Sequence, residues 1–176
     1  MKIKNYVGVA FTAVALFIGQ ATFAQYDKAE KTIVETAIAT EDLSTLVAAV
    51  KAADLVDALS SEGPFTVFAP TNTAFEALPE GTVTTLLKPE NKSALAGILT
   101  YHVVSGDVKA ADVLQLIENG NATVETLAGG TLTFWTKDGK AYVQDENENS
   151  AEIIMPNVAT SNGTVHVINS VLLPKK

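Results

Sequence analysis

The sequence predicts an α+β fold in which N-terminal helices pack on a mainly antiparallel β-sheet, arranged as a wedge or sandwich. In the first half, one apolar stripe has the i, i+3, i+4, i+7 spacing of a helix face: Leu43, Leu46, Val47 and Val50. From residue 122 onward, apolar and polar residues alternate with the period of a strand. Helices followed by strands favour α+β over an alternating parallel fold.

The first elements are bounded by residues that disfavour a regular backbone. The stripe helix should end near Asp54, because Asp tolerates the left-handed conformation better than most residues. A short helical turn at residues 55–59 and a loop at 61–64 follow. Residues 65–68 are expected to form a strand that Pro70 ends.

Two more helices are expected before the strand-rich half. Asn72 or Thr73 can cap the first, and Glu76 would complete a capping box with Thr73. A Pro-Glu-Gly sequence then ends that helix. The second has Pro89 in its first turn and runs to about residue 100.

An Asp138-Gly139 pair predicts a two-residue hairpin turn in the second half. That turn would pair Phe134 with Val143 and Trp135 with Tyr142. The Phe134 face should then lie on the core, leaving Trp135 and Tyr142 side by side on the other face. Two further strands, at about residues 151–155 and 164–172, complete the expected sheet.

The N-terminus has the features of a secretory signal. Two lysines precede an apolar run at residues 6–18, and Thr22 and Ala24 supply small residues for cleavage before Gln25. We expect a signal peptide at 1–24, a lead-in at 25–31 and one domain at 32–174. The alternative is an uncleaved anchor, for which the run is short. The expected location is secreted or periplasmic, with no membrane span after cleavage.

Composition excludes several classes of function. The chain has 12 Lys against 20 Asp plus Glu, a net charge of −8, and neither Arg nor Cys. A protein this acidic, without any Arg to bind phosphate groups through two hydrogen bonds, is not expected to bind nucleic acid. The absence of Cys excludes disulfides and a thiol nucleophile.

Sequence motifs of several enzyme classes are also absent. His102 and His166 are the two histidines, and the chain has no Gly-x-Ser-x-Gly elbow, phosphate-binding Gly-rich loop or His-Glu-x-x-His. One interpretation is a catalytic or metal-binding pair, as in an exported hydrolase. The favoured one is two buried rings whose nitrogens bond backbone or hydroxyl groups. We therefore expect no enzyme, catalytic residue, metal or cofactor.

Three segments in fixed order resemble the motifs of the fasciclin domain family, an extracellular adhesion module. They are TVFAPTNTAF at 66–75, LTYHVV at 99–104 and SNGTVHVINSVLLP at 161–174. The resemblance covers about residues 32–174 and implies a fasciclin-like fold with a structural network of motif residues. The residues it implies are Thr66, Thr71, Tyr101, His102, Asn162, Gly163 and His166.

The resemblance also implies candidate partner-binding positions. In some animal matrix proteins of the family, integrin contact is assigned to the tyrosine–histidine segment and to a Glu-Pro-Asp-Ile-Met motif. Here Tyr101 matches the first, and Pro156 and Asn157 stand within the second, whose two acidic residues are absent.

Two features remain open from the residues alone. Trp135 and Tyr142 form either an exposed contact surface for sugars or proteins, or a pair packed beneath helices. Residues 145–149 imitate the start of a calcium loop, but Ser150 and Pro156 replace its Gly and final Glu. That segment is either a weak calcium site or, as we favour, a solvated hairpin end.

The sequence thus predicts a bacterial, non-enzymatic adhesion or matrix-interaction module. The expected partner is a cell-surface or matrix protein, and the alternative is a polysaccharide of the cell envelope or biofilm matrix.

Overall fold

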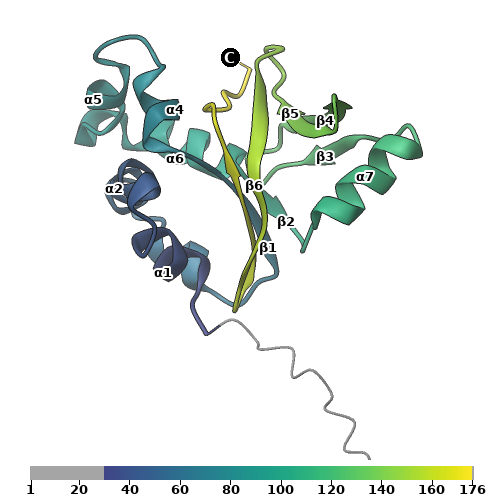
Figure 1. Cartoon of the computed structure of the whole chain (residues 1–176). Helices are drawn as coiled ribbons and strands as arrows, with labels where there is room; N and C mark the ends of the chain where they lie inside the picture. The colour runs from purple at the N-terminus through teal and green to yellow at the C-terminus, as the bar shows by residue number, and fades with distance from the viewer. Residues whose placement is uncertain (1–29, 176) are drawn as a thin grey trace, which may run out of the picture.

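The computed structural model describes residues 30–175 as an α+β wedge built around a seven-stranded sheet (Figure 1). The expected fold class is confirmed. The expected signal peptide at 1–24, and the lead-in up to residue 29, lie outside the described residues. Across residues 30–175, none of the helices combines the length and the apolar character that a membrane span requires.

The elements occur in mixed order along the chain. The α-helices are α1 (Ile33–Ile38), α2 (Ser44–Ala52), α3 (Val56–Ser60), α4 (Asn72–Glu76), α5 (Thr82–Leu86), α6 (Lys92–Tyr101) and α7 (Ala110–Glu118). Two 3-10 turns, η1 (Glu41–Leu43) and η2 (Pro89–Asn91), precede α2 and α6. The strands are β1 (Phe65–Pro70), β2 (Val103–Ser105), β3 (Thr123–Glu125), β4 (Thr131–Lys137), β5 (Lys140–Gln144), β6 (Ser150–Thr160) and β7 (Gly163–Ile168).

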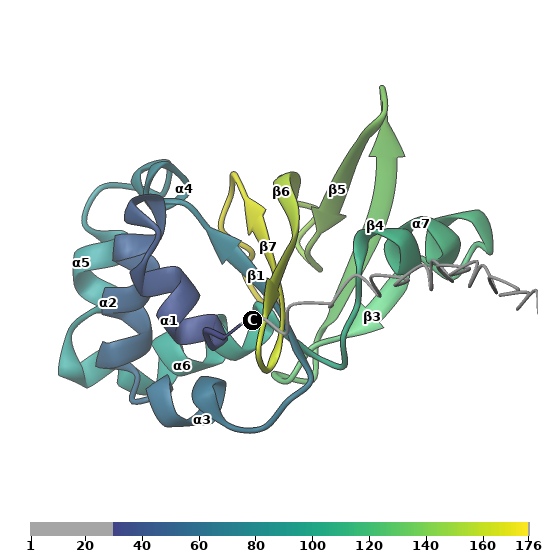
Figure 2. The ribbon, with the colours of Figure 1, turned by 60° about the horizontal axis from the view of Figure 1, so that its bottom comes forward.

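The sheet has the strand order β2-β1-β7-β6-β5-β4-β3. Its pairs are antiparallel except β1 with β7, which is parallel. The long strand β6 links the two halves, and two register shifts around Met155 bend it. The β4–β5 hairpin consequently projects away from the helical layer (Figure 2).

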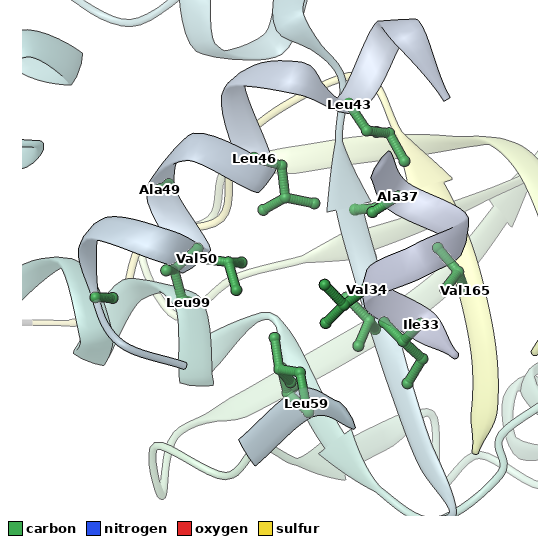
Figure 3. Packing of buried hydrophobic residues seen from close by; sticks show 14 of the residues in the cluster. Ile33, Val34, Ala37, Leu43, Leu46, Ala49, Val50, Leu59, Leu99 and Val165 are labelled. Carbon is green, nitrogen blue, oxygen red and sulfur yellow. The ribbon is translucent and has the colours of Figure 1, made fainter. Parts of the chain in front are cut away.

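Two apolar clusters hold the wedge together. The first packs α1, α2 and α6 against β1 and β7 (Figure 3), and it includes Val34, Leu46, Leu99 and Val165. The second lies under α7, which places Val113 among buried side chains of the hairpin and of β1. Each fully buried Leu, Val or Phe of this kind contributes about 1.5–3 kcal/mol.

The hairpin register is confirmed. Phe134 pairs with Val143 and Trp135 with Tyr142, while Lys137 stands opposite Lys140 across the turn. Phe134 and Val143 are 1% and 0% exposed, as the core face requires. The left-handed backbone at Asp54 is also as expected, with a φ of 57°.

Several expected boundaries are wrong. The cap of α4 is Thr71, not Asn72 or Thr73, because the Thr71 hydroxyl accepts the Ala74 N–H. Asn72 instead accepts the Thr45 N–H and donates to the Glu41 carbonyl, joining α4 to the start of α2.

The last two strands also differ from their expected bounds. Strand β6 runs to Thr160 because its bulges let it pair with β7 over a greater length. Strand β7 ends at Ile168, since the following residues leave the sheet to bond side chains described below. The segment 101–104 is helix and then strand, with Tyr101 ending α6 and His102 capping it.

Candidate functional site

The tyrosine–histidine motif lies at the junction between α6 and β2. Tyr101 and His102 are 0% and 2% exposed. The Tyr101 hydroxyl donates to the Thr131 carbonyl at 2.8 Å and accepts the Glu146 N–H at 3.1 Å. Burial raises the pKa of Tyr101, so the group remains a neutral donor. Tyr101 therefore ties α6 to the start of β4 and to the β5–β6 turn.

Close packing at this junction also requires a glycine. A Cβ on Gly130 would lie 2.5 Å from Cε2 of the Tyr101 ring and 3.2 Å from the Glu146 carboxylate. With no exposed surface, Tyr101 has nothing to offer a partner, which argues against the partner-binding role that its motif implied.

His102 is held as one neutral tautomer. Its Nδ1–H donates to the Ile98 carbonyl at 2.8 Å, and its Nε2 accepts the Leu172 N–H at 3.0 Å. Burial lowers the pKa of His102 to about 4. Protonation would place an Nε2–H against the Leu172 N–H, so the bond to the C-terminal segment needs the neutral ring.

Asp145 fastens the same C-terminal segment one residue further on. Its carboxylate accepts N–H groups from Asn147, Asn149 and Leu173 at 2.8 to 2.9 Å. The Asn147 side chain donates a hydrogen bond from its Nδ2 to the Leu173 carbonyl at 2.7 Å. Asp145 is 5% exposed. Its buried carboxylate organises the turn through these bonds and is not the first ligand of an open calcium loop. In the described part of the chain, no group of three or more His, Asp or Glu could hold a metal.

His166 is also buried, and it is held as the opposite tautomer to His102. Its Nε2–H donates to the Val108 carbonyl at 2.8 Å, and its Nδ1 accepts the Asn157 N–H at 3.3 Å. The ring stacks on Phe68 with centroids 5.4 Å apart. Burial again lowers the pKa. Both histidines thus bond backbone groups through both ring nitrogens, and neither ring is poised to activate a nucleophile.

The remaining motif residues also bridge segments distant in sequence. The Thr66 hydroxyl donates to the Gly106 carbonyl and accepts the Val108 N–H. The Asn162 side chain accepts the Ile33 N–H and donates to the Leu59 and Ser61 carbonyls. A Cβ on Gly163 would overlap the Phe65 carbonyl oxygen. These contacts support the structural role that the resemblance implied.

The stretch around the β6 bulge combines a structural contact with exposed surface. The Asn157 side chain accepts the Ala110 N–H at 2.8 Å, which ties β6 to the start of α7. Both Pro156 and Asn157 are nevertheless exposed, and so is Met155 at 54%. Their partner-binding role stays a prediction.

The aromatic pair lies on the face of the hairpin opposite α7. Trp135 and Tyr142 stack with ring centroids 4.4 Å apart and planes inclined by 13°. Both side chains are half-buried. Helix α7 packs on the other face, against Phe134 and Val143. The pair therefore does not lie beneath α7, but its side chains are not fully exposed either, and its role in binding stays a prediction.

Comparison with known proteins identifies the family. The fasciclin domain model matches residues 41–174. This chain belongs to the fasciclin domain family. It is 53% identical to protein sll1483 of Synechocystis sp. over 182 residues, covering 94% of this chain and 95% of the relative. It is also 39% identical over 131 residues to the transforming growth factor-beta-induced protein ig-h3 of Sus scrofa, covering 74% of this chain and 17% of the relative.

The fold of this fasciclin domain also matches a solved structure. The FAS1 domain pair of the insect cell adhesion molecule Fasciclin I superposes with a TM-score of 0.75 at 18% identity, covering 82% of this chain and 51% of that one. At this identity the likeness concerns the fold alone.

Proposed function

We propose that the mature chain is an exported, non-enzymatic adhesion module that contacts a cell-surface or extracellular-matrix partner through its hairpin face. The observation that carries this proposal is the stacked Trp135–Tyr142 pair, which is half-buried on a face opposite α7. Aromatic side chains are enriched at the energetic centres of interfaces. Membership of the fasciclin domain family, whose model matches residues 41–174, supports the same function.

A non-enzymatic role agrees with the state of the two histidines. His102 and His166 are 2% and 0% exposed, and their ring nitrogens bond backbone groups. A hydrolase would need one of them as a free base beside a nucleophile. A screen against ester and glycoside substrates should therefore detect no turnover, and turnover lost in His102→Ala or His166→Ala would contradict this part of the proposal.

Export rests on the N-terminal sequence. The intact mass of protein recovered from the periplasm or medium of the natural host should fit residues 25–176, since Thr22 and Ala24 mark a cleavage site before Gln25. A soluble protein with the full-length mass would overturn the assignment of a signal peptide.

The contact surface is tested with the immobilised mature domain and a native cell-envelope preparation. Trp135→Ala should reduce retention of envelope components by at least about tenfold, as the loss of an anchoring aromatic would. Trp135 is half-buried, so circular dichroism must show that the variant is folded. Undiminished retention by a folded Trp135→Ala variant would remove the hairpin face from the proposal.

A polysaccharide is the second candidate partner. The same aromatic pair favours it, because sugars bind flat rings through their C–H faces and hydrogen-bond to polar neighbours. Thr133 and Gln144 stand opposite each other beside the pair and supply such neighbours.

A further inference from the structure

The hairpin face carries a charge pattern that the aromatic pair alone does not explain. Lys137 and Lys140 are directly opposite each other across the Asp138-Gly139 turn. Alternate residues of a strand share a face, so both lysines stand on the face of Trp135 and Tyr142. Like charges in opposite positions destabilise a sheet. Departures from such local rules are expected mainly at functional or strained sites.

Positive side chains are the minority among the charged residues of this molecule. The chain has a net charge of −8 and no Arg. Lys140 is partly neutralised by Glu152, whose carboxylate lies 2.8 Å from its Nζ. Lys137 forms no ion pair with any residue between 30 and 175, and its side chain is exposed. The face therefore presents an available cation next to an aromatic platform.

The stacked rings of Trp135 and Tyr142, which we call the platform, are open on the side of β4 that faces away from β5. Strand β3 pairs with β4 only as far as Thr133, so no strand flanks Trp135 on that side. Because Trp135 and Tyr142 stack on each other and β6 places Glu152 beside Tyr142, the ring face left for a ligand is the outer one of Trp135. Thr133 and Gln144 add a hydroxyl and an amide one step along the strands.

We propose that this face binds a uronate-bearing polysaccharide, an inference that rests on the proposed adhesion function and names its ligand class. A sugar ring lies against the outer face of Trp135, and its carboxylate bonds Lys137 in a charge-assisted contact. Thr133 and Gln144 bond the hydroxyl groups. The acidic body of the protein repels the polymer elsewhere, which confines the contact to this face.

The size of the platform favours a sugar chain over a protein partner. A stable protein interface buries about 800 Å² on each side around an apolar centre. Here two rings are bordered at once by lysines and small polar groups. A narrow chain with hydroxyl and carboxylate groups matches this mixture better.

The test measures affinity of the mature protein for polygalacturonate, with dextran as a neutral polymer. Binding should be specific for polygalacturonate and should weaken strongly in about 0.5 M NaCl, because exposed charges are screened. Lys137→Glu and folded Trp135→Ala should each bind at least about tenfold more weakly, whereas Lys88→Glu, an exposed lysine outside the face, should stay within about twofold.

Equal binding to the two polymers, or equal effects of Lys137→Glu and Lys88→Glu, would overturn the inference. Its failure is distinguishable from failure of the proposed function. If Trp135→Ala loses the cell-envelope components while the native protein ignores polygalacturonate, the uronate inference is wrong and the adhesion surface stands. If Trp135→Ala does not fold, Lys137→Glu still tests the uronate inference, because this substitution alters only an exposed side chain.

Discussion

The Tyr101–His102 junction and the Trp135–Tyr142 face each contain two adjacent ring side chains, but the protein uses them differently. At the junction both rings are buried, and their polar atoms bond backbone groups, two of which, the Thr131 carbonyl and the Leu172 N–H, belong to distant segments. On the hairpin the rings are half-buried and stack on each other, beside exposed lysines. The motif that characterises the family is therefore placed to hold the fold together, whereas the contact surface that we propose lies on residues outside the motifs.

The largest effect should come from a motif glycine that, like the junction, holds the fold together. Gly163→Ala places a Cβ against the Phe65 carbonyl, where β7 and β1 are paired. Since neither backbone can yield without breaking the parallel ladder, we expect a loss of about 3 kcal/mol or more, measured by urea unfolding. Gly97→Ala is the matched control, because no atom lies within 4 Å of its added Cβ. It should stabilise α6 by up to about 1 kcal/mol.

Acid should weaken the junction next. The pKa of His102 is about 4 in the folded protein and about 6.5 in the unfolded chain. Between these values the unfolded state binds more protons, so stability is complete above pH 6.5 and falls as the pH drops towards 4. The loss should reach about 3 kcal/mol, with a further contribution of the same sign from His166. Unfolding free energies measured from pH 7.5 to 4 should show this slope.

His102→Ala tests the same residue at neutral pH. The variant leaves the Leu172 N–H without its acceptor and opens a small cavity, so we expect a loss of about 1–3 kcal/mol. The fall in stability below pH 6.5 should also become shallower. An unchanged melting temperature together with abolished partner binding would instead make His102 a contact residue.

The smallest effect on stability belongs to the hairpin lysines. Lys137→Thr removes the like-charge repulsion across the turn, so we expect a gain of a few tenths to about 1 kcal/mol. Lys88→Thr, at an exposed position outside the sheet, should leave stability unchanged. A marked loss in Lys137→Thr would show that this lysine serves the fold.

Much of the fold could be predicted because its signals are local. The Asp138-Gly139 turn fixes the register of β4 and β5, and the stripe of Leu46 and Val50 marks the buried face of α2. Helices α1 and α5 are too short to show a stripe. Helix α7 had a usable signal, since Val113, Leu116 and Ile117 have helical spacing.

The site was less predictable because its partners come together only in three dimensions. Asp145 resembled a calcium ligand in sequence, and nothing local indicated that the Leu173 N–H would reach its carboxylate. The link from Asn72 to the start of α2 likewise depends on where η1 lies. The resemblance to the family placed His102 and Asn162 in a network, but their partners needed the structure.

The division between junction and hairpin is tested most directly by comparing cell-envelope retention by His102→Ala and Trp135→Ala at one temperature where both are folded. We predict that His102→Ala melts at a lower temperature but retains envelope components like the native protein. Trp135→Ala should keep most of its stability and lose retention by at least about tenfold. Full retention by Trp135→Ala, together with loss of retention by a folded His102→Ala, would contradict the account and move the contact surface to the junction.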